Sequence, residues 1–304
     1  MLNASLVIAC FLLAQPDPCV DIEFVQVAPQ PRDAKQFQRS PGQDRAVVLI
    51  HGLRLHPFST SNVNKAEMSS WQKPKSSMVT TLAKDADVYA LAYSQNAALD
   101  TIAELPEVVG RVRELKKLGY RDIVLVGHSI GGVLARHLVE DHPELGVTKV
   151  IQVASPNAGS TWAKASWGVR KNQEAFLESI THEGREKSLT GRAAKKIPDG
   201  VAFVCVVCRI PITVDAAVEV GKWDVEVASK RGDGVVSCRC QWSADVQAQG
   251  IPAILLDHAH FTAMRSSSTA EALARLIREP PGRWNVEQVN GARMKILGPM
   301  KTTP

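Results

Sequence analysis

The chain has 304 residues, 45% of them hydrophobic and 22% charged, so it can bury a full core and is not expected to be disordered. Its formal net charge of +5 is modest, and the lysines and arginines are spread along the sequence rather than gathered in one stripe, which argues against nucleic acid as a partner. A mildly basic protein is still attracted to anionic membranes, so peripheral membrane contact stays open beside a solvated mixed surface.

The N-terminus carries the only long apolar run of the sequence, Leu6 to Ala14, and a polar, proline-bearing segment follows it. About nine apolar residues are too few to span a bilayer and suit the hydrophobic region of a signal peptide. We therefore expect residues 1–20 to be a signal peptide and the mature protein to be secreted or periplasmic. The segment Val7 to Cys10 also resembles a lipobox, which makes a lipoprotein the second choice. A cytoplasmic protein with a buried first strand is the third.

Beyond a polar lead segment of residues 21–44, short apolar runs alternate with stretches of helical spacing. The first strand is expected at Arg45 to Ile50, which is continuous and β-branched, as in a strand buried on both faces. The next elements are expected, in chain order, as a helix around Ser76 to Lys84, a strand over Asp87 to Tyr93, a helix over Ala98 to Leu118 with a kink at Pro106, a strand over Ile123 to Val126, a helix over Val133 to Asp141, and strands over Lys149 to Val153 and Val201 to Val207. A strand over Ile251 to Leu256 and a helix over Ser268 to Arg278 close the series. This order predicts a mostly parallel sheet with helices on both faces.

The alternation breaks between Thr161 and Gly200, a polar stretch rich in lysine and arginine whose main aromatic residues are Trp162, Trp167 and Phe176. It looks more like an insertion over a sheet edge than a layer of the core. The simplest partition is one domain over residues 45–280, with a cap insertion at about 161–200 and a C-terminal tail over residues 281–304.

Six cysteines fit an exported protein, in which disulfides persist. The C-x-x-C and C-x-C spacings of Cys205, Cys208, Cys238 and Cys240 resemble those of zinc sites. However, residues three apart on a strand point to opposite faces, which makes a shared metal awkward. We expect a disulfide from Cys208 to Cys238 or Cys240, or plain buried thiols, and no metal.

Ser129 stands in the segment Gly127-His128-Ser129-Ile130-Gly131-Gly132, between an expected strand and an expected helix. A serine hydroxyl is a poor nucleophile, so acyl transfer needs a base beside it, an acid to orient that base, and donors for the oxyanion. The G-x-S-x-G pattern alone is weak. Its position between a buried strand and a helix is the context in which such a serine sits on a tight, exposed turn. We therefore predict Ser129 as a nucleophile.

Two backbone amides are candidates for the oxyanion hole. One is the N–H of Ile130, at the start of the helix after the serine, and the other is the N–H of Leu53, just after His51-Gly52 at the end of the first strand. By itself His51-Gly52 could be an ordinary strand-ending turn. Its pairing with the serine segment favours the functional interpretation.

Four segments together resemble bacterial lipases and esterases of the α/β-hydrolase superfamily. They are Ile50-His51-Gly52, the segment around Ser129, the loop Ser155 to Ser160, and Gly232-Asp233-Gly234-Val235-Val236. The resemblance covers roughly Arg45 to Ile277. It implies the α/β-hydrolase fold, a mostly parallel central sheet flanked by helices with a cap or lid insertion. It also implies a serine hydrolase that needs neither a metal nor an organic cofactor.

The resemblance also implies the other two catalytic side chains. In such lipases the acid lies in a D-G-[LV]-V segment, which carries over to Asp233. Asp215, nearer the end of the Val201 strand, is the alternative acid. The base should come last, in the order Ser, Asp, His. We predict His260, because its His-Phe-Thr segment is similar to that of such relatives. His258, directly after Asp257, is the alternative base, and His128 is expected to shape the pocket.

These residues predict a carboxylic-ester hydrolase, an esterase or lipase, that works through an acyl-enzyme on a small-molecule or lipid ester. An acyltransferase or amidase with the same triad is the alternative, and a non-catalytic binding protein on the same fold is the third hypothesis. A lid that opens onto lipid should expose a broad apolar face, whereas the insertion is basic and polar. Esters of smaller or more polar substrates therefore stand beside lipids as candidates.

Overall fold

A computed structural model describes residues 19–297 except 32, 34–35, 55–60, 165–170 and 211–230. The apolar run Leu6 to Ala14 with Cys10, the alternative acid Asp215, and Trp167 lie outside the described residues. No helix in the described part of the chain is long and apolar enough to cross a membrane.

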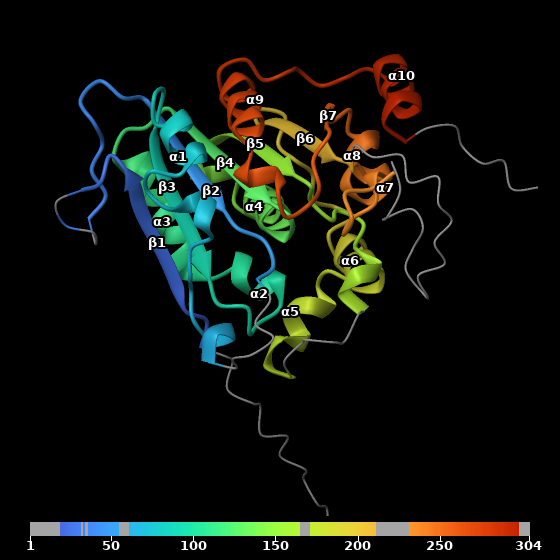
Figure 1. Ribbon diagram of the computed structural model, residues 1–304, viewed down its shortest axis with the longest axis horizontal. Coiled ribbons are helices and arrows are strands. Elements are labelled where there is room, and N and C mark those ends of the chain that lie inside the picture. The colour runs from blue at the N-terminus through green and yellow to red at the C-terminus, as the bar shows by residue number, and fades with distance from the viewer. Residues whose placement is uncertain are drawn as a thin grey trace, which may run out of the picture.

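A seven-stranded sheet forms the centre of the molecule, in the order β1-β3-β2-β4-β5-β6-β7 (Figure 1). The strands are β1 Ile22–Ala28, β2 Arg45–Ile50, β3 Asp87–Tyr93, β4 Asp122–His128, β5 Val147–Val153, β6 Ala202–Cys208 and β7 Ala253–Leu256. Within this sheet β1 pairs antiparallel with β3, and every other neighbouring pair is parallel. The predicted mostly parallel sheet is thereby confirmed.

The helices cover both faces of the sheet (Figure 1). They are α1 Ser77–Leu82, α2 Leu99–Ala103, α3 Pro106–Lys117, α4 Ile130–Asp141, α5 Glu174–Glu178, α6 His182–Gly191, α7 Cys238–Gln241, α8 Ala244–Ala248, α9 Ser267–Arg278 and α10 Val286–Leu297. Short 3-10 turns are η1 Ser61–Asn64, η2 Ser70–Gln72, η3 Pro143–Leu145, η4 Thr161–Lys164, η5 Lys171–Gln173 and η6 Ala263–Arg265.

Alternation along the central strands separates two apolar cores. On β2, Val48 and Ile50 pack in the core that α3 and α4 cover, whereas Val47 and Leu49 pack in the core under α1 and α9. A strand flanked by helices on both sides must be apolar at every position, which is why these strands are continuous apolar runs. Burying each such side chain contributes about 1.5–3 kcal/mol.

Three elements differ from the sequence-based expectation. The stretch predicted as a polar lead segment, residues 21–44, contains β1, which pairs with β3 from Ile22 opposite Tyr93. The expected helix over Ala98 to Leu118 is two helices, because Pro106 begins α3 at the position where its missing N–H costs nothing. In the C-terminal segment, α10 adds a further helix, whose Val289 and Ile296 join the core.

The thiols of Cys205 and Cys208 point to opposite faces of β6, as their spacing predicts, because each belongs to a different apolar core. Both are buried free thiols, so the structure contains plain thiols rather than a disulfide at Cys208. Burial raises the pKa of the Cys208 thiol well above its ordinary value. Among the described residues, no group of three or more His, Cys, Asp or Glu side chains could hold a metal ion.

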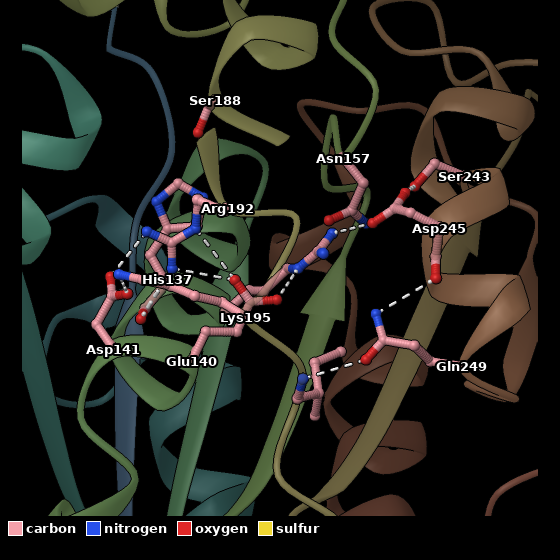
Figure 2. A network of polar contacts seen from close by, with 12 residues as sticks. His137, Glu140, Asp141, Asn157, Ser188, Arg192, Lys195, Ser243, Asp245 and Gln249 are labelled. Carbon is pink, nitrogen blue, oxygen red and sulfur yellow. Dashed lines mark hydrogen bonds and ion pairs between the residues drawn. The ribbon is translucent and has the colours of Figure 1, made fainter. Parts of the chain in front are cut away.

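The segment between β5 and β6, which the sequence predicts as an insertion, is attached to helix α4 by ion pairs with buried carboxylates (Figure 2). Arg192, which follows α6, pairs with Glu140 at 3.0 Å and with Asp141 at 2.8 Å, and both carboxylates are almost fully buried. Lys195 forms a second ion pair with Asp141. Arg185 of α6 is 1% exposed and donates to the carbonyl of Asn157 at 3.2 Å. These basic residues therefore hold the described part of this segment against the core.

Candidate active site

Ser129 occupies a strained turn between β4 and α4. Its φ of 54° and ψ of −132° place a non-glycine residue in a region that costs about 1–3 kcal/mol and persists only where the surroundings enforce it. The Ser129 N–H donates to the carbonyl of Val153 at 2.8 Å, which ties the turn to β5. Because α4 begins at the next residue, the N–H of Ile130 is one of the unpaired amides at a helix N-terminus.

Two glycines allow the close approach of the chain segments around this serine. A Cβ atom on Gly131 would lie 2.3 Å from the carbonyl oxygen of His51. A Cβ atom on Gly52 would lie 2.5 Å from Ser129 Cβ and 3.2 Å from Ser129 Oγ. Both contacts are too short for any larger residue, so the turn at His51-Gly52 lies directly against the predicted nucleophile.

His260 links Ser129 to Asp233. Its Nε2 lies 3.0 Å from Ser129 Oγ, and its Nδ1 lies 2.8 Å from Asp233 Oδ2. The three side chains are 4%, 5% and 1% exposed, for His260, Ser129 and Asp233 respectively. An imidazole nitrogen that faces a carboxylate carries the proton, so Nε2 is left as an acceptor for the serine hydroxyl. This is the protonation pattern that a general base requires.

The loop around Asp233 holds its carboxylate in place. Asp233 Oδ1 accepts hydrogen bonds from the N–H groups of Val235 at 2.9 Å and Val236 at 2.8 Å. Its backbone carbonyl accepts from the N–H of His260 at 2.9 Å, so the acid and base loops are joined twice. A bridge between Gly232 and Ser237 closes this loop. With His260 Nδ1 at Oδ2, three hydrogen-bonding groups therefore surround this buried carboxylate and fix its orientation.

The alternative residues of the sequence analysis lie elsewhere. His258 Nε2 forms a hydrogen bond with Ser268 Oγ at 3.0 Å, at the start of α9, and the carboxylate of Asp257 pairs with Arg209. Of the two histidines, the structure therefore brings His260 to Ser129. Asp215 lies outside the described residues, so Asp233 is the acid that the described site contains.

His128 supports the base loop rather than Ser129 itself. Its Nε2 lies 3.0 Å from the carbonyl oxygen of His260, and the two rings are 4.8 Å apart. Burial, and then the charge of His260, lowers the pKa of His128 well below 6.5. A neutral imidazole can donate to a carbonyl from Nε2, so His128 connects the serine turn to the base loop.

The cavity beside Ser129 is small and has mainly apolar walls. Its volume is about 30 Å³, which is roughly the space of one water molecule. The walls come from the insertion through Trp162, Ala163 and Ile180, and from the acid loop through Val235 and Val236. Leu53, Pro156 and Phe261 complete the apolar lining. The insertion therefore forms part of the site in this conformation.

Two glutamines beside the turn at Gly52 were not singled out in the sequence. Gln95 follows β3, and its Nε2 donates to the carbonyl of Gly52 at 3.0 Å. Gln173 of η5 donates to Gln95 Oε1 at 2.9 Å. Neither residue stands in a recognisable motif, and the bonded pairs are 43 and 78 positions apart in sequence. Only the folded chain brings these side chains together.

Comparison with protein-family models identifies the family. The model described as the alpha/beta hydrolase family matches residues 47–275. The matched stretch runs from β2 into α9 and contains Ser129, Asp233 and His260. The chain therefore belongs to the alpha/beta hydrolase family. A comparison with curated proteins gave no match.

Solved structures with a similar fold include three bacterial or metagenomic enzymes. The lipase BlEst2 of Bacillus licheniformis, in its mature form, is 15% identical with a TM-score of 0.59, over 84% of this chain and 97% of that chain. The phospholipase PlaB of Legionella pneumophila is 14% identical with a TM-score of 0.55, over 84% of this chain and 62% of that chain. The metagenomic carboxyl esterase MGS0156 is 17% identical with a TM-score of 0.50, over 84% and 83% of the two chains. At such identities the similarity shows the fold alone.

Proposed function

We propose that this protein is a serine hydrolase that cleaves carboxylic esters through Ser129, His260 and Asp233. One observation carries the proposal, the unbroken hydrogen-bond chain from Ser129 Oγ through the imidazole of His260 to the carboxylate of Asp233. The strained backbone at Ser129 supports it, because such strain is stored at functional sites. The names of the lipase, phospholipase and carboxyl esterase with similar folds support an ester as the substrate.

The geometry supports acyl transfer in two steps. In the first step Ser129 Oγ attacks the ester carbonyl carbon while His260 Nε2 takes its proton, and Asp233 stabilises the resulting imidazolium. The amides of Leu53 and Ile130 hold the oxyanion of the tetrahedral intermediate. His260 then returns the proton to the leaving alcohol, which leaves an ester on Ser129. In the second step a water molecule replaces the alcohol, with His260 again as base, and releases the carboxylic acid.

The cavity favours a short acyl group over a long chain. Its walls are apolar, so a hydrocarbon acyl group would be bound without unpaired polar atoms. Its volume of about 30 Å³ is far below the 300–1,000 Å³ that is typical of pockets for larger ligands. We therefore propose small esters as the preferred substrates, with Trp162 and Phe261 limiting the length of the acyl group.

A fluorophosphonate probe tests the nucleophile directly, because it labels an activated serine covalently. We expect labelling of the wild type and none of Ser129→Ala. Ser155→Ala is the matched control, since Ser155 is another buried serine, on the loop after β5, and this variant should label like the wild type. An unlabelled wild type, or equal labelling of Ser129→Ala, contradicts the proposal.

The substrate class is tested with p-nitrophenyl esters of two to sixteen acyl carbons. We expect kcat/KM to be highest for the short esters and to fall with chain length. Parallel reactions with an added acceptor alcohol show whether the acyl group goes to water or to the alcohol. A preference for long chains would contradict the role assigned to the small cavity.

A further inference from the structure

The peptide unit between Gly52 and Leu53 is held by two donors. The carbonyl oxygen of Gly52 lies 2.7 Å from His51 Nδ1 and accepts from Gln95 Nε2 at 3.0 Å. His51 Nε2 accepts from the N–H of Tyr93 at 3.3 Å, so the ring proton is on Nδ1, where it can be donated to Gly52. Stacking of the His51 ring on Tyr93, with centroids 4.5 Å apart, fixes the plane of the imidazole.

Orienting this carbonyl also orients the amide of Leu53. A trans peptide unit is planar, and its C=O and N–H point in opposite directions. With the Gly52 oxygen fixed toward His51 and Gln95, the Leu53 N–H must point away from them. Gly52 itself lies against Ser129, where an added Cβ would be 3.2 Å from Ser129 Oγ. A flipped peptide would lose both hydrogen bonds and would present a carbonyl instead of an amide.

Gln95 contacts the backbone on both sides of Leu53. Its Nε2 donates to the Gly52 carbonyl, and its Oε1 accepts from the N–H of Arg54 at 3.0 Å. The side chain is 2% exposed, so water does not compete for these bonds. A single carboxamide therefore spans the turn that carries the proposed oxyanion donor.

The insertion fixes the orientation of this carboxamide. Gln173 Nε2 donates to Gln95 Oε1 at 2.9 Å and to the carbonyl of Arg54 at 3.1 Å. If the Gln95 amide rotated by half a turn, its NH₂ group would face two donors, from Arg54 and Gln173, and its oxygen would face the Gly52 carbonyl. Gln173 is fully buried, which makes such a mismatch costly.

We propose that Gln95 is a positioning residue that preorganises the oxyanion hole, and that Gln173 holds it in place from the insertion. This inference rests on the proposed function, because it assigns a role within the same site. Gln95 does not contact the substrate. It acts through the Gly52–Leu53 peptide, so its contribution should appear where negative charge develops, in the transition state and not in ground-state binding.

The test compares Gln95→Met with Gln72→Met. Gln72 is the matched control, because it is a fully buried glutamine that donates to strand carbonyls, at Leu49 and Leu91, away from the turn. Methionine keeps the length of the side chain and removes both hydrogen-bonding groups. The measurements are kcat and KM on p-nitrophenyl butyrate, Ki for a trifluoromethyl ketone that adds to Ser129 as an oxyanion, and Tm.

For Gln95→Met we expect kcat to fall about tenfold or more with KM little changed, because removal of a whole oxyanion donor costs about 10²–10³ in kcat. Ki for the ketone should weaken by the same factor as kcat/KM. For Gln72→Met we expect a lower Tm with kcat and Ki at wild-type values. Gln173→Met should lower kcat less than Gln95→Met does. In this variant too, Ki should weaken by the same factor as kcat/KM.

Gln95→Glu is a second test variant, in which the donor to the Gly52 carbonyl is replaced by an acceptor. It keeps an acceptor for the Arg54 N–H but places a carboxylate oxygen against the Gly52 carbonyl, so its loss of kcat should be at least as large as that of Gln95→Met. If Gln95→Met does not fold, Gln95→Glu and Gln173→Met carry the test.

The inference is overturned if the folded variants lower Tm alone, while kcat and Ki keep their wild-type values. Turnover that persists in Ser129→Ala would instead contradict the proposed function. Turnover that depends on Ser129 but is insensitive to Gln95 and Gln173 would contradict only the role given to these glutamines.

Discussion

His128 Nε2 lies 3.0 Å from the carbonyl oxygen of His260, so the residue before the proposed nucleophile supports the loop that carries the proposed base. His260 is buried and His128 is half-buried, and desolvation lowers the pKa of His128 well below 6.5. At neutral pH His128 is therefore a neutral imidazole that can donate from Nε2 to this carbonyl. We expect His128 to affect catalysis indirectly, by holding His260 in position.

Replacing His128 by leucine removes this donor, whereas His128→Gln keeps an N–H group that can reach a carbonyl. We expect His128→Leu to lower kcat by about tenfold, because His260 would no longer be held in the position that proton transfer requires. His128→Gln should lower kcat less. Steady-state kinetics on p-nitrophenyl butyrate measure both values. Equal losses in the two variants would show that the hydrogen bond to His260 has no role.

His260→Ala and His258→Ala separate the two candidate bases. We expect His260→Ala to lose about three or more orders of magnitude in kcat, because His260 Nε2 is the acceptor that lies 3.0 Å from Ser129 Oγ in the described site. His258 forms its hydrogen bond with Ser268, so His258→Ala should keep kcat within about twofold of the wild type. The reverse order of effects would reassign the base.

Asp233→Asn tests the acid without removing its volume. Two backbone N–H groups, from Val235 and Val236, face Oδ1, so the amide oxygen of the asparagine should take that position. The NH₂ group would then face His260 Nδ1 and move the ring proton to Nε2, where it blocks proton transfer from Ser129. We expect a loss of about 10⁴ in kcat.

Asp257→Asn is the matched control for this variant, because Asp257 pairs with Arg209 and does not contact His260 in the structure. Its kcat should stay close to the wild-type value. A comparable loss in both variants would indicate a general effect of removing a carboxylate and would contradict the role of Asp233.

His137 of α4 should make the protein less stable in mild acid. Burial lowers its pKa to about 4, although its Nδ1 faces Asp100 at 2.8 Å. The unfolded chain takes up this proton near pH 6.5. The folded state resists it down to about pH 4, so stability is full above pH 6.5 and falls as the pH drops through this window. The loss from this group should approach about 3 kcal/mol near pH 4.

Urea unfolding at pH 7 and pH 4.5 measures this difference in the free energy of unfolding. His137→Gln cannot titrate, so the difference between the two pH values should be smaller than in the wild type. His258→Gln, which changes a half-buried histidine that contacts Ser268, should keep the wild-type difference. An unchanged pH dependence in His137→Gln would show that another group controls acid sensitivity.

Much of the fold could be predicted because buried parallel strands are continuous apolar runs. The expected strands Arg45 to Ile50 and Asp87 to Tyr93 match β2 and β3 residue for residue. Strand β1 was not predicted because it is an antiparallel edge strand that is only partly buried. It carries polar residues such as Glu23 and Gln26 between the apolar ones. Its apolar signal is therefore weaker than that of a central strand.

Some residues of the candidate site could be predicted from sequence motifs, and others could not. Ser129, Asp233 and His260 stand in recognisable segments, and the structure brings their side chains together. His258 and His260 are only two positions apart, and the sequence favoured His260 through a resemblance alone, because the direction of each side chain appears only in the folded chain. The hydrogen bonds of Gln95 had no sequence signal at all, because a glutamine near a strand end is common and its partner at Gly52 is 43 positions away.

The ion pairs between the insertion and α4 also make the two segments mutually dependent (Figure 2). Exchanging the insertion for a segment of another sequence would remove Arg192 and Lys195. Glu140 would keep Arg136 as a partner, but Asp141 would lose both of its cations. A buried carboxylate stripped of its partners costs about 3–5 kcal/mol, so a successful graft must bring its own cations or neutralise Asp141 first. The covering segment and the helix behind the serine would have to be redesigned as one unit.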